Sequence, residues 1–256
     1  MPLICAILTY VRSLTKGDVI LRIQIAPEIF TSYPGYARHV LIAEEVDNSA
    51  QNAELSAMLI AAQEALRGDA SFTDLAAHPR IASWRGVFEK FGTNPNRCPP
   101  SIANLIKRVR AGKDLPYINS LVCIFNIISM KYILPAGGDD LDKVVGDIRL
   151  AHASGAETYV PLGLPCAAEN PRPGEIILYD TGNGDVFCRA WCWKNGDRSR
   201  IEETTRRVAV NVDAMPPVGA EEGRAAAEET AELVRRFCGG RVSIHRLSKD
   251  TDSLEL

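Results

Sequence analysis

The sequence predicts an α+β domain of sandwich-like build. Segments in which apolar residues alternate with polar ones and segments with helical spacing come in blocks along the chain. Strict alternation of strand and helix, which a doubly wound parallel sheet would require, is not found. The 256 residues are 46% hydrophobic and 24% charged, with no internal repeat and no low-complexity tract. That length and composition allow a sizeable hydrophobic core and exclude disordered and collagen-like classes.

The first third of the chain predicts two strands and a helix. Residues 21–25 alternate apolar and polar side chains, and residues 39–43 form a second apolar run after a Pro-Gly turn. A helix follows, with apolar residues three and four positions apart up to Leu66 and an end at Gly68. Residues 1–11 are apolar but lack a charged leader and a cleavage site, so we expect one strand or an extension there rather than a secretory signal.

The middle third predicts helices separated by one proline-rich loop. Residues 84–91 have helical spacing, and residues 93–100 contain three prolines, which require a loop. Ser101 is then expected to cap the next helix, and Asn119 to cap the apolar helix over residues 120–131. Asn126 falls inside that apolar helix, where it is either a structural crosslink or a group that faces a pocket.

Beyond residue 135 the chain is expected to be rich in strands. Residues 137–140, Gly-Gly-Asp-Asp, predict a turn. The expected strands cover residues 146–150, 157–162, 175–179, 185–189 and 207–213, the third and fourth of these forming a hairpin. A helix is predicted after Pro216-Pro217, ending at Gly239-Gly240, and the tail from Ser248 is expected to fray.

Charge is distributed unevenly along the chain. The whole carries 29 Lys and Arg against 32 Asp and Glu, a net charge of −3, which argues against non-specific coating of nucleic acid. Residues 84–113 nevertheless hold seven cations and one anion, a net charge of +6. This segment is either a phosphate-facing surface or a solvated helix face whose cations are favoured by the helix dipole.

The cysteines and the absence of known short motifs limit the kinds of site that the sequence can form. The seven cysteines are an odd number without regular spacing, which is typical of reduced residues in a cytoplasmic protein. Cys188 and Cys192 lack partners for a zinc site, so we expect neither metal nor cofactor. No nucleotide-binding loop, zinc-protease motif or nucleophile elbow is present, and no apolar run reaches the ~18 residues of a membrane span. The residues alone assign no catalytic group.

A pattern of short elements in fixed order extends from Trp84 to Asp213. Its members are Trp84-Arg85, Phe91-Gly92, Pro100-Ser101, Leu115-Pro116, Asn126, Leu134-Pro135, Gly146-Asp147, Tyr179-Asp180, Trp191 to Lys194 and Thr204 to Arg206. This pattern resembles the tRNA-binding and editing domain formed by the third and fourth domains of the bacterial phenylalanyl-tRNA synthetase beta subunit. It is more similar still to free-standing proteins built on that domain.

The resemblance implies a layered β/β/α fold and a division of the chain. Residues 81–215 would form the editing-like domain. Residues 1–80 would be an N-terminal extension and strand-helix segment packed on it, and residues 216–256 a C-terminal helix and tail. The activity of the parent is hydrolysis of the ester that joins a wrong amino acid to tRNA, with water positioned by substrate and backbone rather than by a metal or a covalent nucleophile.

Six residues match positions that would bind the substrate: Asn119, Asn126, Asp140, Trp193, Asp197 and Thr204. Each also has a local alternative. Asn119 could be a helix cap, the two aspartates turn formers, Trp193 a core residue and Thr204 a strand-edge hydroxyl. The chain departs from the family pattern in having no histidine after Pro135 and in having Cys123 where the family has an aspartate.

These inferences lead to one hypothesis and two alternatives. The hypothesis is a stand-alone deacylase that clears mischarged tRNA in trans, with the aminoacylated 3′ end of tRNA as partner and neither DNA nor membrane involved. Its tRNA-binding surface would consist of Arg97, Lys107, Arg108, Arg110 and Lys113. The alternatives are a non-catalytic module that binds tRNA or a free amino acid, and a small-molecule hydrolase or sensor independent of tRNA.

Overall fold

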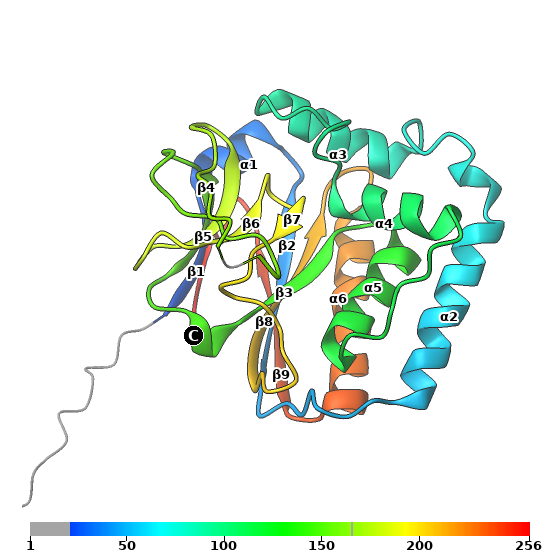
Figure 1. Ribbon diagram of the computed structural model, residues 1–256. Helices are drawn as coiled ribbons and strands as arrows, with labels where there is room; N and C mark the ends of the chain where they lie inside the picture. Colours follow the sequence, from blue (N-terminus) through cyan, green and yellow to red (C-terminus); the bar gives the residue numbers. More distant parts are fainter. Residues whose placement is uncertain (1–20, 165) are drawn as a thin grey trace, which may run out of the picture.

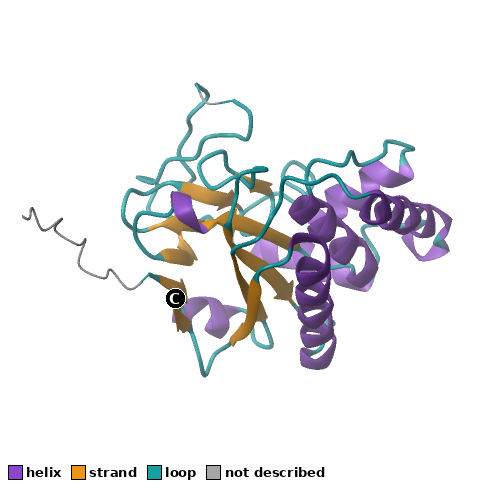
Figure 2. Ribbon diagram, turned by 90° about the horizontal axis from the view of Figure 1, so that it is seen from below, coloured by secondary structure: helices purple, strands orange, loops and turns teal. Residues whose placement is uncertain are grey.

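The computed structural model describes residues 21–164 and 166–256, arranged in three layers (Figure 1). A six-stranded sheet packs on a four-stranded sheet, and helices cover the other face of the four-stranded sheet. The strands and the main helices therefore lie on opposite sides of the molecule (Figure 2). The predicted α+β class and β/β/α layering are confirmed. The strand or extension expected at residues 1–11 lies outside the described residues.

The six-stranded sheet is mostly antiparallel. Its strands, in spatial order, are β10 (Ser253–Glu255), β1 (Arg22–Ile25), β4 (Ile148–His152), β5 (Ile176–Asp180), β6 (Val186–Arg189) and β7 (Lys194–Asn195). Only β1 and β4 are parallel neighbours. Strands β5 and β6 form the hairpin that the sequence predicts.

The four-stranded sheet is antiparallel throughout and forms the middle layer. Its order is β3 (Ala136–Asp140), β8 (Arg207–Ala214), β2 (Ala37–Glu44) and β9 (Arg241–Leu247). The predicted N-terminal segment contributes one strand, the predicted central domain two and the predicted C-terminal segment one. The division at residues 80 and 215 stays a prediction.

The helix layer is built around α5. The helices of the described residues are α1 (Pro27–Ser32), α2 (Ala53–Gly68), α3 (Pro79–Lys90), α4 (Ser101–Arg110), α5 (Ser120–Tyr132) and α6 (Ala220–Cys238), with short 3-10 turns η1 (Ala70–Phe72) and η2 (Leu141–Lys143). Helix α1 lies outside the helix layer and packs with the six-stranded sheet. Helix α5 packs between α2 and α6, and nine of its 13 residues are buried. No helix in the described part of the chain is both long and apolar enough to cross a membrane.

The turn expected at residues 137–140 is wrong, because these residues belong to strand β3. Gly138 is required by packing rather than by a turn. A Cβ atom there would lie 3.0 Å from the ring of Phe125 on α5 and 3.1 Å from the carbonyl oxygen of Ala209. A glycine inside a strand marks such a close approach, and this one lets α5 pack directly on the sheet.

Smaller differences occur at element ends. Ser101 is the first residue of α4 and makes no capping bond, since Pro100 occupies the cap position. Residues 157–162 form isolated bridges in place of the expected strand. The tail expected to fray contains β10, which pairs with β1 and brings the backbone N–H of Leu256 within 2.9 Å of the Leu21 carbonyl oxygen. Strand β10 is thus stabilised by β1, a partner distant in sequence.

Candidate functional site

The face of the four-stranded sheet that meets the other sheet carries a buried ionic cluster. Arg38 on β2 donates from Nε and Nη2 to the two carboxylate oxygens of Asp213 on β8, at 2.7 and 2.9 Å. The Tyr36 hydroxyl donates to the same carboxylate at 2.7 Å, and burial raises the pKa of this phenol well above its ordinary value. Arg38 is only 1% exposed. The pair is bidentate, the arrangement that best compensates buried charges.

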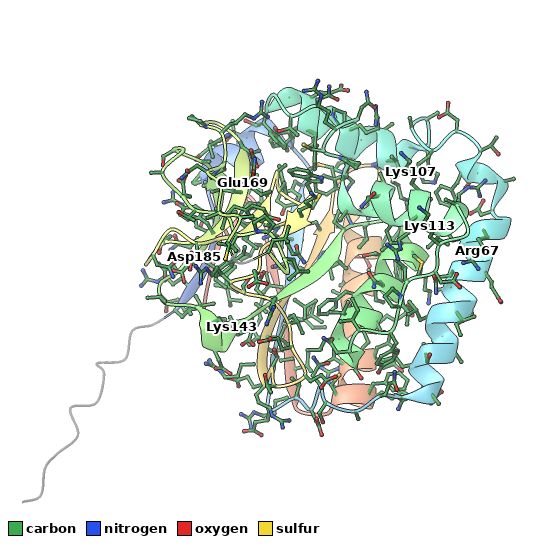
Figure 3. The ribbon with its side chains drawn as sticks, viewed as in Figure 1. Arg67, Lys107, Lys113, Lys143, Glu169 and Asp185 are labelled. Carbon is green, nitrogen blue, oxygen red and sulfur yellow. The ribbon has the colours of Figure 1, made fainter. Side chains whose placement is uncertain are left out.

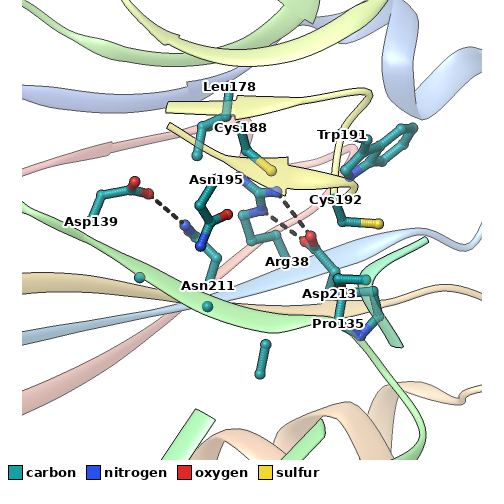
Figure 4. A pocket seen from close by; sticks show the side chains of 14 residues that line it. Arg38, Pro135, Asp139, Leu178, Cys188, Trp191, Cys192, Asn195, Asn211 and Asp213 are labelled. Carbon is teal, nitrogen blue, oxygen red and sulfur yellow. Dashed lines mark hydrogen bonds and ion pairs between the residues drawn. The ribbon is translucent and has the colours of Figure 1, made fainter. Parts of the chain in front are cut away.

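Between the two sheets lies a small chamber of about 80 Å³ (Figure 4). We call it the inner chamber; its lining includes Arg38, Ser101, Leu178, Cys188, Trp191, Cys192, Asn211 and Asp213. Arg38 Nη1 and Trp191 Nε1 are buried donors with no acceptor among the described residues. Trp191 has φ of +65°, a left-handed conformation that bulky side chains rarely adopt. The chamber has room for several water molecules and offers them polar partners.

A larger cavity of about 440 Å³ opens beside the inner chamber. This outer cavity is bounded by the start of α5, by β3 and by the loop after β7. Its lining includes Ile118, Asn119, Val122, Phe125, Asn126, Leu162, Ser199, Arg200, Glu202 and Glu203. Residues 136–139 and Asn195 line both spaces, so β3 and Asn195 separate them. The arrangement combines an apolar wall with a few convergent polar groups, as small-molecule sites commonly do.

Asp139 lies where the two spaces adjoin and is buried in the protein. Its carboxylate accepts a hydrogen bond of 2.6 Å from the Ser199 hydroxyl, and the Asn211 amide lies 3.5 Å away (Figure 4). Burial raises the pKa of Asp139 to about 6, with Asp140 adding to the rise and the Ser199 hydroxyl and Arg38 opposing it. This carboxyl group therefore titrates close to neutral pH.

Sequence reasoning missed Asp139 because it took the Gly-Gly-Asp-Asp segment for a turn. In strand β3, Gly137 and Asp139 face the same side of the sheet, and Gly137 pairs with Asn211. The sequence did contain a usable pattern. If residues 136–140 are taken as a strand, its two-residue period puts Asp139 on the same face as Gly137. Glycine without a side chain leaves open space beside the carboxylate.

The rim of the outer cavity holds its charges in ion pairs. Arg200 donates to Glu202 at 2.6 Å and to Asp197 at 3.1 Å, and Lys143 donates to Glu202 at 2.6 Å. Hydrogen bonds from Lys143 and Arg200 lower the pKa of Glu202. Glu202 is thus an ionised, fully engaged carboxylate, unlike Asp139.

Two of the six predicted substrate residues line the outer cavity. Asn119 is the N-cap of α5, as expected: its Oδ1 accepts from the backbone N–H of Val122 at 3.0 Å, and its amide donates to the Ile201 carbonyl at 3.4 Å. Asn126 lines the cavity one helical turn beyond the apolar start of α5. No hydrogen bond from the Asn126 side chain to another described residue is found, which favours the pocket-facing alternative over the crosslink.

The other four predicted substrate residues do not line either space. Asp140 accepts from the Thr205 hydroxyl at 2.7 Å and caps η2, and Thr204 itself is exposed. Trp193 packs on the core of the six-stranded sheet, with the Lys194 ammonium 4.7 Å from the centroid of its ring. A role in substrate binding for these residues stays a prediction.

Asp197 connects two loops at the rim of the outer cavity. Its Oδ1 accepts from the backbone N–H of Gly163 at 3.0 Å as well as from Arg200. The carboxylate therefore holds Arg200, which lines the cavity, against the loop that carries Leu162. Its observed contacts are those of a residue that positions the rim.

The basic segment contains cations that bond to the protein backbone and cations that are exposed, among them Lys107 and Lys113, which Figure 3 labels. Arg110 Nη1 donates to the carbonyls of Leu66, Arg67 and Asp69 at 3.4, 3.3 and 2.8 Å, which closes the end of α2. Arg108 donates to the Asp114 carbonyl at 3.2 Å. Three other predicted tRNA-binding cations, Arg97, Lys107 and Lys113, are exposed, and no ion pair to them is found within residues 21–164 and 166–256. The free positive charge thus lies mainly at the end of α4 and in the loop that follows.

The comparisons with known proteins identify the family. The B3/4 domain matches residues 83–239 of the chain. No curated protein matches. A solved structure of an N-terminal fragment of the phenylalanyl-tRNA synthetase beta-subunit from Pyrococcus horikoshii is 15% identical, with a TM-score of 0.46. That match covers 89% of this chain and 52% of the fragment, so the chain spans about half the fragment's length. The match over residues 83–239 places the chain in the B3/4 domain family, which is related to the phenylalanyl-tRNA synthetase beta subunit.

Proposed function

We propose that this protein hydrolyses the ester between an amino acid and the 3′ end of tRNA, acting in trans on mischarged tRNA. The observation that carries the proposal is the outer cavity, which lies in a B3/4 domain and is lined by Asn119 and Asn126. A volume of about 440 Å³ is in the range of small-ligand pockets. Such a cavity suits an aminoacyl group and part of its nucleoside.

The mouth of the cavity supports binding of a nucleoside. Ile118 and Leu162 are 56% and 57% exposed and line the cavity from two different loops. Large apolar side chains so exposed mark binding surfaces when they gather at a cavity. Their apolar surfaces suit a flat base, because single-stranded RNA is commonly recognised through the faces of its bases.

The free cations lie within reach of this mouth. Lys113 and Ile118 are five positions apart in the chain, so their Cα atoms are at most about 18 Å apart. Lys107 lies on the last turn of α4, just before Lys113 in the chain. Phosphates near the 3′ end could therefore contact these lysines while the terminal residue occupies the cavity.

The decisive experiment is deacylation of a panel of deliberately mischarged, radiolabelled tRNAs. We expect turnover of at least one tRNA, and a loss of about tenfold or more in Asn126→Leu. Asn104→Leu is the matched control, because Asn104 is an exposed asparagine on α4 outside the cavity. Tight tRNA binding without turnover would identify a non-catalytic module. Turnover of small esters that persists in Lys107→Glu/Lys113→Glu would identify a hydrolase independent of tRNA.

A second pair of variants tests the mouth. Leu162→Asp should raise KM for aminoacyl-tRNA about tenfold by removing an apolar surface on which the base lies. Leu164→Asp is the control, since Leu164 belongs to the same loop and is 58% exposed but does not line the cavity. Equal effects of the two substitutions would contradict the assignment of the mouth.

A further inference from the structure

We infer, on the basis of the proposed hydrolysis, that Asp139 is the general base that takes the proton from the attacking water. Asp139 lines both the outer cavity and the inner chamber. It therefore lies between a space large enough for the aminoacyl ester and a space of the size of a few water molecules. The inference adds a proton acceptor to a site for which the sequence assigned none.

The inner chamber is built to hold water next to this carboxylate. Arg38 Nη1 and Trp191 Nε1 are fully buried donors that line the chamber, and neither has a protein acceptor within the described residues. Buried donors of this kind are normally satisfied by ordered water. Water bound to them would occupy the chamber whose wall includes Asp139 and would keep this side of the carboxylate hydrated, while the attacking water binds Asp139 from the outer cavity, where the ester lies.

The hydrogen bonds of Asp139 leave it free to accept a proton. Its Oδ1 accepts from the Ser199 hydroxyl at 2.6 Å. Among residues 21–164 and 166–256, its Oδ2 has a single hydrogen-bond contact, the long 3.5 Å contact with the Asn211 amide. One oxygen is thus held in place while the other is weakly engaged. A general base needs this combination of fixed orientation and an available lone pair.

The charged groups around Asp139 come from each neighbouring strand. Arg38 faces it from β2, Asp140 follows it on β3, the Cys188 thiol faces it from β6, and Asp213 on β8 completes the pair with Arg38. Because Asp213 neutralises Arg38, the carboxylate of Asp139 keeps a proton affinity suited to work near neutral pH.

Other side chains in the two spaces are less suited to this role. Glu202 is engaged by Lys143 and Arg200. Burial raises the pKa of Cys188 and Cys192, so both thiols remain protonated and neutral. No histidine is among the residues that line either space. Asp139 is therefore the group that geometry and protonation favour together.

In the proposed reaction Asp139 takes one proton from water and later returns it. The water oxygen forms a bond to the ester carbonyl carbon while one water proton passes to Asp139. The tetrahedral intermediate then breaks its bond to the ribose oxygen, which receives the proton back from Asp139. The products are the free amino acid and tRNA with a free 3′-terminal hydroxyl, and Asp139 returns to its carboxylate form.

The test is the pH dependence of kcat/KM for the best substrate of the tRNA panel, compared across three variants. Asp139→Asn should lower kcat/KM about 10²- to 10⁴-fold while leaving the affinity for an amide-linked aminoacyl-adenosine analogue within about threefold. Ser199→Ala should remain active and move the acidic limb to higher pH, because the Ser199 hydroxyl lowers the pKa of Asp139. Asp142→Asn, an exposed carboxylate on η2, is the control and should keep the wild-type profile.

The outcomes separate the two proposals. If wild-type protein hydrolyses a mischarged tRNA but Asp139→Asn keeps more than one tenth of that activity, the general-base inference is overturned and the deacylase function stands. An acidic limb that does not move in Ser199→Ala would likewise overturn it. If wild-type protein hydrolyses none of the panel, the proposed function fails and the inference falls with it.

Discussion

The two faces of the four-stranded sheet differ in their polar content. The helix face is apolar, whereas the face toward the six-stranded sheet combines apolar residues such as Val40 and Ile42 with a buried polar cluster. On the side of the helices, Val208, Val210 and Val212 of β8 are completely buried against the helix layer. On the other side, the intervening Asn211 and Asp213 face the six-stranded sheet together with Arg38. One strand thus supplies both an apolar core and a polar interior, through the two-residue period of its side chains.

The two faces are expected to contribute differently to the free energy of folding. Apolar burial on the helix face is the ordinary source of folding free energy. A buried ion pair is weak evidence for stability, because well-packed apolar residues of the same volume often do as well or better. The polar face is therefore better explained by the two adjoining spaces that it lines.

Breaking the ion pair on the polar face should have the largest effect. Asp213→Asn removes the charge that compensates Arg38, so we expect a loss of about 3–5 kcal/mol in the free energy of unfolding. Urea denaturation measures it. The double variant Arg38→Met/Asp213→Leu should recover most of this loss, and failure to recover it would show that the pair itself stabilises the fold.

Truncation on the apolar face should cost somewhat less and should not depend on pH. Ile124 on α5 is fully buried, so Ile124→Ala should lower the free energy of unfolding by about 2–5 kcal/mol. The same loss is expected at pH 5 and pH 8, because no titrating group is removed. A clear pH dependence of this loss would contradict the division between the two faces.

Asp139→Asn should stabilise the protein, but only above the range in which Asp139 titrates. The pKa of Asp139 is raised from 3.8 to about 6 in the folded protein, so the folded state binds more protons than the unfolded state between these values. Wild-type stability therefore falls as pH rises through this window. The variant should be equal to wild type near pH 4 and more stable by about 3 kcal/mol at pH 8.

Thermal or urea denaturation at both pH values checks this prediction. A gain at pH 8 together with lost activity would be the trade-off expected of a functional residue. Equal stability of variant and wild type at pH 8 would mean that the Asp139 carboxylate costs nothing in the folded protein.

The smallest effects are expected in the basic segment. Arg110→Ala should cost about 1 kcal/mol, because three carbonyls at the end of α2 lose their donor. Lys107→Ala should leave stability unchanged and instead weaken tRNA binding and reduce its salt dependence. Urea denaturation of both variants measures their stability, and tRNA-binding assays at several salt concentrations measure their affinity and its salt dependence. A loss of binding confined to Arg110→Ala would place the tRNA elsewhere.

Local patterns were sufficient for the helices and for part of the site. The spacing of apolar residues predicted α2 and α5, and Asn119 was correctly expected as the cap of α5. Asn126 was singled out because an amide inside an apolar helix needs an explanation, and the structure places it in the outer cavity. These features depend on neighbours within a few residues, so they can be recognised without the fold.

Asp139 could not be recognised in this way. Its surroundings depend on β3 pairing with β8 and on Ser199, which is 60 residues away in the sequence. The pattern Gly-Gly-Asp-Asp is typical of a turn, but residues 136–140 pair with β8 along their whole length, and Phe125 packs against Gly138. The error came from applying a local rule where a tertiary contact decides.

The sequence by itself determined the α+β class, the five longer helices and the uneven distribution of charge, because each follows from periodicity or composition. The short helix α1 was not predicted. Only the tertiary structure decided which cations are free, since Arg110 is engaged by the end of α2 while Lys107 is exposed. It also raised the pKa of Asp139, because distant strands remove this carboxyl group from water and burial disfavours its charged form.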